Sequence, residues 1–585
     1  MDKIHSYLDS ALDYYKGGKI EITDGLEFSQ ADTIKTIEYY SNSRYLTGDK
    51  DNLLREKPFY NISNFRVRVA KTASDIDIKD IKVEADKPKF FAQSMLLNSE
   101  LFKWMKESNF SQTLNEMGEV RPRYGGILVK KREEKIDGEK KLKIDVVEWK
   151  NAYTDLVNIL GLVIECHYID PSEFSKKADV WDNVEDVLKA FTKKTKGKYT
   201  GEKIEVYEIH GEFPESMYED GGDDSVYHKM VFYVACVGKQ RFTLFKDYED
   251  ELPYMYLPWE KVSGRGLGRG VVEEGFEAQV WTNDAIMAIK DAMDLAGKVV
   301  LYTDSQKLGG KNVLADVDNG HVFELEQGKT LTSINLIPSA LPEFQNLINL
   351  WKDQYDRTAS TFDANTGEEA PSGTPYSQTA LLNQVANTPF AYQREVWGIF
   401  LNEMINKWIF PFLIKKMKDG HTLVTDFTDE ELKIIDESFA LSEANDEYKK
   451  KILRGDLVYM QDYLDAIEAY KGIQQSLGRK RYIEIPDSFF DDVECKVTIN
   501  ITGEQKNKAA VLQSLNTILI TVAQNPHILQ DPVLYKIFGS IIEMAGVPLS
   551  PIQLKPAGQM TAPMPEQMGQ LNQPVTTNDA TPQIQ

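Results

Sequence analysis

Residues 264–297 read GRGLGRGVVEEGFEAQVWTNDAIMAIKDAMDLAG, and the rest of the predicted fold can be built outward from them. Neither glycine nor proline interrupts the run between Gly275 and Gly297. Glu273, Glu274 and Glu277 lie near the start of this segment and Lys290 and Lys298 near its end, which complements the helix macrodipole. Gly297 stands at a natural C-cap position. The segment therefore predicts one long helix.

The glycine cluster at 264–270 invites comparison with phosphate-binding loops, but its spacing fits neither known pattern. The motif GxxxxGK followed by Ser or Thr occurs nowhere in the chain, and Arg269 breaks the dinucleotide pattern GxGxxG. We interpret the cluster as a flexible hinge that leads into the helix.

A second helix is predicted at 341–360, because its apolar residues fall on one stripe at helical spacing. The stripe consists of Leu341, Phe344, Leu347, Ile348, Trp351 and Tyr355. Between the two helices, residues 298–340 contain the strand-like patches VVLYT and HVFELE, separated by glycines. Two long helices thus bracket a small β-rich insert.

The next segment, 361–374, is an acidic loop rich in glycine, proline and serine, which no regular element accommodates. Thr374 can cap a following helix whose first position is Pro375. That helix, within 375–425, is long and apolar, and we expect it to be kinked at Pro389.

The C-terminal part begins with helices and returns once to strand structure. Residues 426–503 are predicted to be helical first and to end in a half-buried strand, because apolar and polar residues alternate from Val493 to Ile501. Further helices are expected within 504–550. Residues 551–585 have the polar, nearly uncharged composition of a flexible tail.

The N-terminal part, residues 1–263, combines both kinds of element. Its first 120 or so residues have helical spacing, and from Gly126 the apolar period switches to two, with a hairpin turn at Asp137 and Gly138. Further strand-like runs lie at 204–210, 227–236 and 241–245. The predicted fold class is α+β.

The composition limits the possible partners. The chain has 585 residues, and 91 acidic residues against 68 basic ones give it a formal net charge of −23. A protein that grips nucleic acid through phosphates carries a basic face, so this chain would repel DNA or let it slide. The N-terminus lacks the apolar core of a signal peptide, and no run reaches the ~20 apolar residues of a membrane span. We expect a reducing, aqueous location and no membrane partner.

Motifs that carry chemistry are scarce. The three cysteines form no CxxC pair, the seven histidines form no HxH or HExxH pair, and GxSxG does not occur. Cys166 and His167 lie in the apolar run VIECHYID, which is typical of a buried thiol. The acidic cluster around Glu219 and Asp223 is interpreted as a solvated turn, with a weak cation site as the alternative. We expect no catalytic, cofactor or metal site.

The order of these segments resembles the portal proteins, or head-to-tail connectors, of tailed bacteriophages. The resemblance is carried by residues 252–298, LPYMYLPWEKVSGRGLGRGVVEEGFEAQVWTNDAIMAIKDAMDLAGK. There an apolar strand ending in Pro258 and Trp259 and a glycine-rich turn lead into a helix with Gln279 and Asn283 one turn apart. The resemblance spans most of the chain.

The resemblance implies a portal fold with named parts. These are an N-terminal wing at 1–263, a first stem helix at 264–297, a β-rich clip at 298–340, a second stem helix at 341–360, a tunnel loop at 361–374, a kinked wing helix at 375–425, a C-terminal wing at 426–503, a short helical crown at 504–550 and a flexible tail at 551–585.

It also implies a function without catalysis or cofactors. Portal subunits form a ring, typically of twelve copies, at the capsid vertex of the virion, after assembly in the host cytoplasm. Double-stranded DNA is packaged and ejected through the ring without sequence-specific binding. The expected partners are the terminase large subunit, a head-tail adaptor or tail proteins, and the major capsid protein. The separate terminase ATPase agrees with the missing P-loop.

Candidate residues follow for each role. The ring interface is expected on the apolar stripe, at Phe344, Leu347, Ile348, Trp351 and Tyr355. Channel contacts to DNA are expected from Lys290, Lys298, Lys352 and Arg357, with pairing to acids such as Asp294, Asp353 and Asp356 as the alternative. The tunnel-loop candidates are Phe362, Asp363, Thr366, Gly367, Glu368, Glu369, Pro371, Ser372 and Gly373.

Two other functions remain open at this point. One is a different ring-forming virion component, such as a tail adaptor or baseplate protein, although those are usually shorter. The other is a virion enzyme that uses the acidic loop at 361–370 as a carboxylate pair. The absence of convergent His, Ser or metal-ligand spacing counts against the enzyme.

Overall fold

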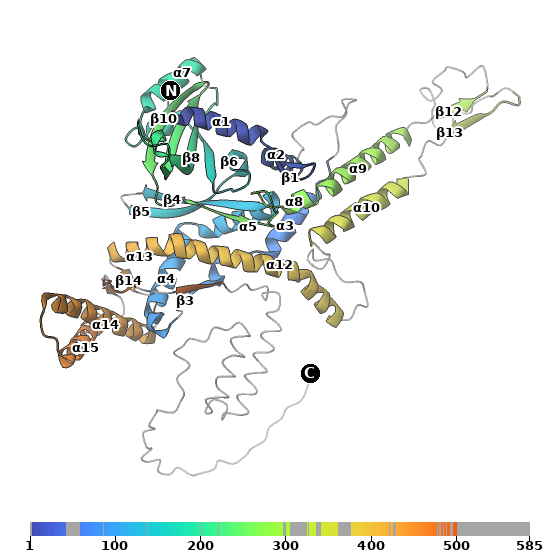
Figure 1. The fold of residues 1–585 in the computed structure, drawn as a ribbon. Helices are drawn as coiled ribbons and strands as arrows, with labels where there is room; N and C mark the ends of the chain where they lie inside the picture. Colours follow the sequence, from blue (N-terminus) through green and yellow to red (C-terminus); the bar gives the residue numbers. More distant parts are fainter. Residues whose placement is uncertain are drawn as a thin grey trace, which may run out of the picture. The chain divides into compact units, whose positions relative to one another are not determined.

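The chain divides into two compact units, Met1–Ile501 and Thr502–Gln585, and the computed structural model describes most of the first. The described residues are 3–41, 59–85, 87–136, 139–198, 200–219, 221–296, 300–304, 325, 327–334, 341–360, 376–419, 422–424, 427, 429–476, 478, 481–483, 485–486, 488–491 and 495–499. The helices and tail predicted at 504–550 and 551–585 lie outside them. Within the described part, helices and antiparallel strands are mixed, which confirms the α+β class (Figure 1).

The helical character predicted for the first part of the chain is confirmed. Its helices are α1 (Lys3–Gly17), α2 (Gln30–Ser41), α3 (Ser63–Ala73), α4 (Phe91–Glu107) and α5 (Phe110–Tyr124). Short strands that the helical spacing did not predict are β1 (Ile20–Thr23), β2 (Leu26–Phe28) and β3 (Ile81–Ala85). Single 3-10 turns occupy Ile78–Asp80, Pro88–Phe90, Trp149–Asn151 and Glu215–Met217.

A five-stranded antiparallel sheet forms the centre of the N-terminal part, in the order β10-β9-β8-β7-β6. Its strands are β6 (Ala152–Thr154), β7 (Leu162–Ile169), β8 (Ile204–Pro214), β9 (Tyr227–Val237) and β10 (Gln240–Tyr248). Alternate side chains such as Ile164 and Ile209 pack against Ile4 and Leu8 of α1. The connecting helices are α6 (Pro171–Ser175) and α7 (Val184–Thr195), whose Phe174 and Val187 pack on the same sheet.

A three-stranded sheet in the order β11-β4-β5 contains the predicted hairpin. Its strands are β4 (Gly126–Ile136), β5 (Glu139–Val146) and β11 (Tyr254–Pro258). Ile136 pairs with Glu139 across the predicted turn. Ile127 and Val129 are buried in the main core of the protein, together with Leu101 of α4.

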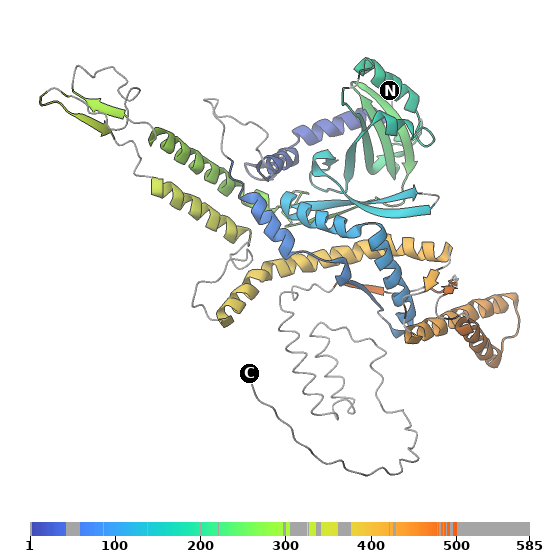
Figure 2. The same cartoon turned by 180° about the vertical axis from the view of Figure 1, so that it is seen from behind.

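The two long helices predicted around the β insert are confirmed. They are α9 (Phe276–Ala296), preceded by the short α8 (Val271–Glu274), and α10 (Leu341–Thr358). The helices run side by side (Figure 2). The chain between them forms an antiparallel ribbon of β12 (Val300–Thr303) and β13 (Leu331–Ile334).

The ribbon contains one strand that the sequence did not predict, while the predicted strand at 321–326 lies almost entirely outside the described residues. The partner of β12 lies downstream of the predicted HVFELE patch, of which the structure describes only Leu325, outside any strand. The residues of β13, LTSI, include two hydroxyl side chains and lack the apolar run on which the prediction relied.

The long helix predicted after Pro375 is α12 (Tyr376–Met404), and Pro389 lies inside it. Figures 1 and 2 show this helix bent along its length, as expected from a proline that removes a backbone donor. A π-helical turn at Ile405–Ile409 then leads into α13 (Phe410–Asp419). Leu401, Met404 and Ile405 are fully buried in the main core.

The remaining described elements are α14 (Asp429–Arg454), α15 (Met460–Ser476), β14 (Thr422–Val424), β15 (Arg481–Ile483) and β16 (Cys495–Ile499). The strand predicted from the alternation near Val497 is therefore confirmed. Its partner is β3, about four hundred residues earlier in the chain, where Val83 faces Val497. Among the described helices, none combines the length and the apolar composition that crossing a bilayer requires.

Candidate functional site: the helical hairpin and the buried charges

The glycine-rich turn before α8 is tightly packed, which corrects the expectation of a flexible hinge. Gly264 has a positive φ of 85°. A Cβ added at Gly270 would lie 2.6 Å from the backbone nitrogen of Gly125, and one at Gly268 would overlap the carbonyl oxygen of Gly125. The glycines are thus explained by the close approach of two backbone segments, not by mobility.

Arg265 fixes the same turn to the start of the hairpin. Its guanidinium donates two hydrogen bonds to the carboxylate of Glu273, at 2.7 and 2.8 Å, and one to the carbonyl of Gly268 at 3.1 Å. It also lies 4.3 Å from the ring centre of Phe28. The Arg265 side chain is 4% exposed, so this bidentate pair is screened little by water.

Trp259, which directly follows β11, connects this strand to α12. Arg121 lies between Trp259 and Trp397, with its guanidinium carbon 5.2 and 5.5 Å from the two ring centres. It donates a 2.7 Å hydrogen bond to the side-chain oxygen of Gln393. Burial lowers the pKa of Arg121 to about 9. Arg121 thus links α5, β11 and the bent helix.

Gln279 joins α9 to the start of α3. Its Oε1 accepts hydrogen bonds from the backbone N–H groups of Ile62 and Ser63, at 3.0 and 3.1 Å, and from the Ser63 hydroxyl at 3.1 Å. Its Nε2 donates to the carbonyl of Tyr60 at 2.7 Å. One turn later, Asn283 accepts the N–H of Tyr60 at 3.0 Å. The first N–H groups of a helix lack partners inside it, so Gln279 caps α3 from a distant helix.

The other helix of the hairpin is joined to the same place. Arg66 of α3 donates to the carboxylate of Asp356 at 2.7 Å and to the carbonyl of Lys352 at 3.2 Å. Its guanidinium lies 4.6 Å from the ring centre of Tyr355. The Tyr355 hydroxyl donates to the carbonyl of Val271 at 3.0 Å. Helix α3 therefore holds both helices of the hairpin, α9 through Gln279 and α10 through Arg66.

Because of these contacts, only part of the predicted interface stripe is available to a neighbouring subunit. Tyr355 is 1% exposed and lies in the core of its own chain, so its side chain is not available to a neighbouring subunit. Trp351 stacks on Trp281 of α9, with ring centres 6.2 Å apart and planes 3° apart. Phe344, Leu347 and Ile348 are half-buried. These residues and Trp351 remain interface candidates.

The predicted channel cations differ in their surroundings. The Lys352 ammonium donates to the Tyr60 hydroxyl at 3.2 Å and lies over that ring, while Arg357 is exposed and Lys290 is half-buried. Lys298 lies outside the described residues. Asp356, one of the acids proposed as an alternative partner, pairs with Arg66. The tunnel-loop candidates also fall outside the described residues: Phe362, Asp363, Thr366, Gly367, Glu368, Glu369, Pro371, Ser372 and Gly373.

A buried group of charges between the two larger sheets escaped the sequence analysis. Glu165 and His167 on β7, and Glu208 and His210 on β8, lie on one face of the five-stranded sheet, where Glu165 pairs with Glu208 in register. Lys130 of β4 donates to both carboxylates, at 3.0 Å to Glu165. The repeated Glu-x-His spacing was the available signal, because a period of two places both side chains on one face of a strand.

Hydrogen bonds determine the charge state of this group. Burial alone would lower the pKa of His210, but its ring nitrogens lie 2.9 Å from Glu208 and 2.8 Å from Glu249, and these contacts raise the pKa. Burial alone would raise the pKa of Glu208, but hydrogen bonds from His167 and His210 hold it well below its usual value. The Tyr233 hydroxyl donates to Glu208 as well, at 2.6 Å. The described charges thus compensate one another.

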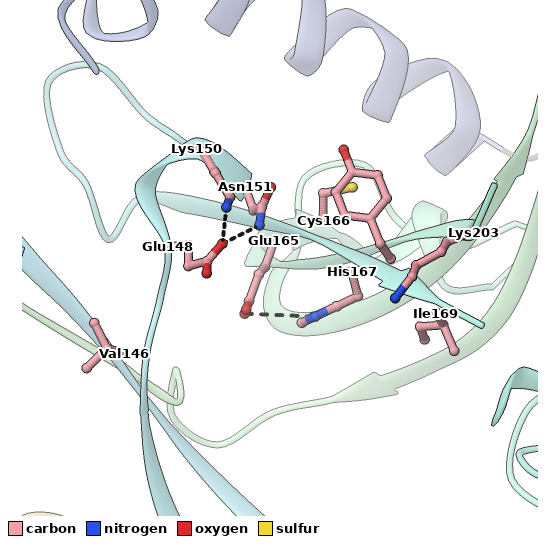
Figure 3. Close-up of a pocket in the computed structure, with 10 residues that line it drawn as sticks. Val146, Glu148, Lys150, Asn151, Glu165, Cys166, His167, Ile169 and Lys203 are labelled. Atoms are coloured by element: carbon pink, nitrogen blue, oxygen red, sulfur yellow. Dashed lines mark hydrogen bonds and ion pairs between the residues drawn. The ribbon is translucent and has the colours of Figure 1, made fainter. Parts of the chain in front are cut away.

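The same group has the donor atoms of a metal site. Ligand atoms of Glu165, His167 and Glu208 lie within 4.8 Å of one another, beside a pocket that Glu165 and His167 help to line (Figure 3). The ammonium of Lys130 already lies against both carboxylates. A metal ion would have to displace it, so the arrangement is better explained as an internal network of ion pairs and hydrogen bonds.

The thiols of the five-stranded sheet are unreactive, as the sequence predicted for Cys166. Cys166 and Cys236 are buried. Burial raises the pKa of Cys166 to about 11 and that of Cys236 to about 12, so neither forms a thiolate near neutral pH. Of the predicted acidic turn, Asp223 and Asp224 are indeed at the surface, where Asp224 lies 3.5 Å from Lys3.

Comparison of the sequence with models of known protein families gives no match, and comparison with curated proteins gives none either.

Proposed function

We propose that this chain is the subunit of a ring-shaped portal at the capsid vertex of a tailed bacteriophage. The observation that supports the proposal best is the helical hairpin: α9 and α10 run side by side, are joined by a β ribbon, and are fixed at their base by Gln279 and Arg66. The portal resemblance implied this order of elements, from the glycine-rich turn to the bent helix after α10.

The anchoring of the hairpin suits a ring. Closure by head-to-tail contacts needs two different complementary faces on each subunit. A helix pair held rigidly at its base can present one face of α9 and another of α10 at a constant angle. The half-buried Leu347 and Ile348, together with the half-exposed Trp281, supply apolar area for such contacts.

The charge of the chain suits a conduit for DNA. A formal net charge of −23 per subunit would keep a duplex from adhering to the wall. Lys290, Lys298, Lys352 and Arg357 are the cations that we assign to the channel side of the stem. Double-stranded DNA passes through without sequence-specific binding. The loop at 361–374 is proposed to act as a compliant collar that retains packaged DNA.

The proposal also implies which proteins are the partners of this chain. The terminase large subunit supplies the ATPase, a head-tail adaptor or tail proteins attach after packaging, and the major capsid protein surrounds the ring. No catalytic residue or cofactor is assigned to the chain. The buried charged network and the buried thiols have structural explanations and require no reaction.

Electron microscopy of the purified protein tests the proposal. Rings of constant subunit number are expected, and Leu347→Asp should convert them to smaller species by burying a charge at the contact. Leu350, which is 64% exposed on the same helix, provides the control Leu350→Asp. Near-UV circular dichroism would verify that the variants remain folded. A monomeric wild-type protein would contradict the portal and favour the virion enzyme, while a ring without DNA passage would favour a tail adaptor.

A further inference from the structure

The helices α14 and α15 form a hairpin whose two halves are packed very differently. The first half of α14 belongs to the main core through Leu432, Ile435 and Phe439, and Phe439 stacks on Phe489 with ring centres 4.4 Å apart. The second half of α14 packs on α15. There Tyr448 meets Tyr463 edge to face at 5.3 Å.

Polar contacts complete the pairing of the two helices. The Tyr463 hydroxyl donates to Asn445 at 2.6 Å, and the Tyr470 hydroxyl donates to Glu447 at 2.7 Å. These bonds fix the relative rotation of the helices. The faces that point away from this seam are therefore presented in a constant geometry.

The hairpin leaves an unusual amount of apolar surface uncovered. With the described part of the chain in place, Gln474 is the one buried residue of α15. Around the turn, Leu453 and Leu457 are each 87% exposed and Met460 is 73% exposed. The exposed apolar set, here called the hairpin patch, consists of Ile452, Leu453, Leu457, Tyr459, Met460, Leu464 and Ile473. Five members of the set, from Ile452 to Met460, lie within nine positions around the turn, and apolar side chains gathered at the surface in this way mark an interaction site in a soluble protein.

The last ten residues of α14 and the whole of α15 carry opposite net charge, although α14 as a whole is acidic. The end of α14, residues 445–454, has four basic and two acidic residues, for a net charge of +2. Helix α15, residues 460–476, has three acidic residues and one lysine, for a net charge of −2. Lys449, Lys450 and Arg454 on the first helix are exposed, as are Asp462, Asp465 and Glu468 on the second.

We propose that the hairpin patch is a contact between subunits, in which the basic end of α14 in one copy lies against the acidic α15 of the next. The inference rests on the proposed ring only in taking the neighbour to be another copy of this chain. A surface that is basic on one side and acidic on the other is complementary to itself in a head-to-tail arrangement, which is the kind of contact that closes rings. The apolar patch between the charges would then be buried.

The charges also favour a second copy over a lipid surface. An anionic membrane would attract the end of α14 but repel Asp462, Asp465 and Glu468 beside it. A second copy can pair the basic end of α14 with its own acidic α15. Its contact would add to those proposed for the stem, at a different place in the subunit.

Reversal of each charged helix tests the contact. One variant carries Lys449→Glu and Lys450→Glu, the other Asp462→Lys and Asp465→Lys, and a control carries Lys176→Glu and Lys193→Glu at exposed positions near α6 and α7. Each hairpin variant alone should need about tenfold or more protein to assemble, measured by analytical ultracentrifugation. An equimolar mixture of the two should assemble like the wild type, because opposite charges face each other again.

The apolar part is tested separately. Leu453→Gln with Leu457→Gln should weaken assembly without loss of folding, since both side chains are exposed, while the exposed Val180→Gln serves as the control. Wild-type rings that persist unchanged in all hairpin variants would overturn this contact and leave the portal proposal intact. A monomeric wild type would overturn both. Binding of the wild type to phosphatidylserine vesicles, lost in Leu453→Gln with Leu457→Gln, would replace the second copy with a lipid surface.

Discussion

Gly275 lies directly against the ring of Tyr355, so that a Cβ at this glycine would overlap the ring carbons. The contact joins the break between α8 and α9 to the end of α10. Tyr355 can donate to the carbonyl of Val271 only because this space is empty. The close packing at the hairpin base therefore depends on a missing side chain in one helix and a buried ring in the other.

Replacement of this glycine should be costly. Gly275→Ala is expected to destabilise the protein by about 1–3 kcal/mol, because the ring of Tyr355 must move within a packed core. The matched control is Gly118→Ala within α5, where an added Cβ would be 3.9 Å from the nearest atom. The control should be neutral or stabilising by up to about 1 kcal/mol. Urea unfolding of both variants decides between them, and equal stabilities would contradict the packing.

Loss of the cap that Gln279 provides for α3 should weaken the attachment of α9 to α3. In Gln279→Met, three buried donors lose their acceptor, and we expect a loss of about 3 kcal/mol in the free energy of unfolding. Hydrogen exchange at residues 60–66 should accelerate. Gln345→Met, at an exposed position of α10, should change the stability by no more than about 0.5 kcal/mol. Unchanged exchange in the Gln279 variant would refute the capping role.

Two neighbouring arginines should respond differently to the same change. Arg265→Lys removes a bidentate pair whose arginine side chain is 4% exposed, and we expect a loss of about 2–4 kcal/mol. Arg269→Lys affects a pair with Glu260 in which both side chains are nearly half exposed, and it should cost less than about 1 kcal/mol. Thermal unfolding monitored by circular dichroism gives the comparison. Similar losses in both would contradict the stronger pairing that burial gives to Arg265.

The buried network predicts a pH dependence of stability. The folded pKa of His210 is raised above its usual 6.5, so its contribution is fully present below about pH 6.5 and is lost as the pH rises through the folded value. The free energy of unfolding should therefore fall on the alkaline side of neutrality. Glu208, with its lowered pKa, contributes in the opposite sense: its share is present above about pH 4.5 and is lost in acid.

His210→Gln separates the two effects. The variant should lose about 2–4 kcal/mol at pH 6, because Glu208 and Glu249 lose a charged donor. Its alkaline slope should flatten, while the acid slope should weaken but persist, because His167 and Lys130 still lower the pKa of Glu208. His228→Gln, at an exposed position, should keep both slopes. Urea titrations from pH 4 to pH 9 measure them. An unaltered alkaline slope in the His210 variant would assign the dependence to other groups.

The channel cations give a prediction that depends on the proposed function. Lys290, Lys298, Lys352 and Arg357 replaced together by Gln should leave rings intact and change the retention of packaged DNA. Lys176→Gln with Lys193→Gln is the control for altered surface charge. Genome content of filled heads at low and high salt is the measurement, since phosphate contacts weaken with salt. Retention equal to the wild type at both salt concentrations would exclude contact between these side chains and DNA.

The spacing of residues that are close in sequence predicted more of the fold than of the candidate functional site. The hairpin at 126–146, the helices α9 and α10 and the strand around Val497 were all predictable, because their signals come from residues two to four positions apart. Gln279 and Asn283 were recognisable as a motif. What they bind was not, because Tyr60, Ile62 and Ser63 are more than two hundred residues away in sequence.

By itself, then, the sequence determined the kind and order of the main elements, the acidic charge and the absence of the motif GxxxxGK followed by Ser or Thr. Only the tertiary structure decided that the glycines at 264–270 are packed, that Tyr355 is a core residue, that β13 lies at Leu331–Ile334, and that Lys130, Glu208 and His210 meet between two sheets. Periodicity records which face of an element is apolar. It carries no information on which distant element covers that face. Buried charges and close backbone contacts depend on which elements pack together, so they could not be predicted.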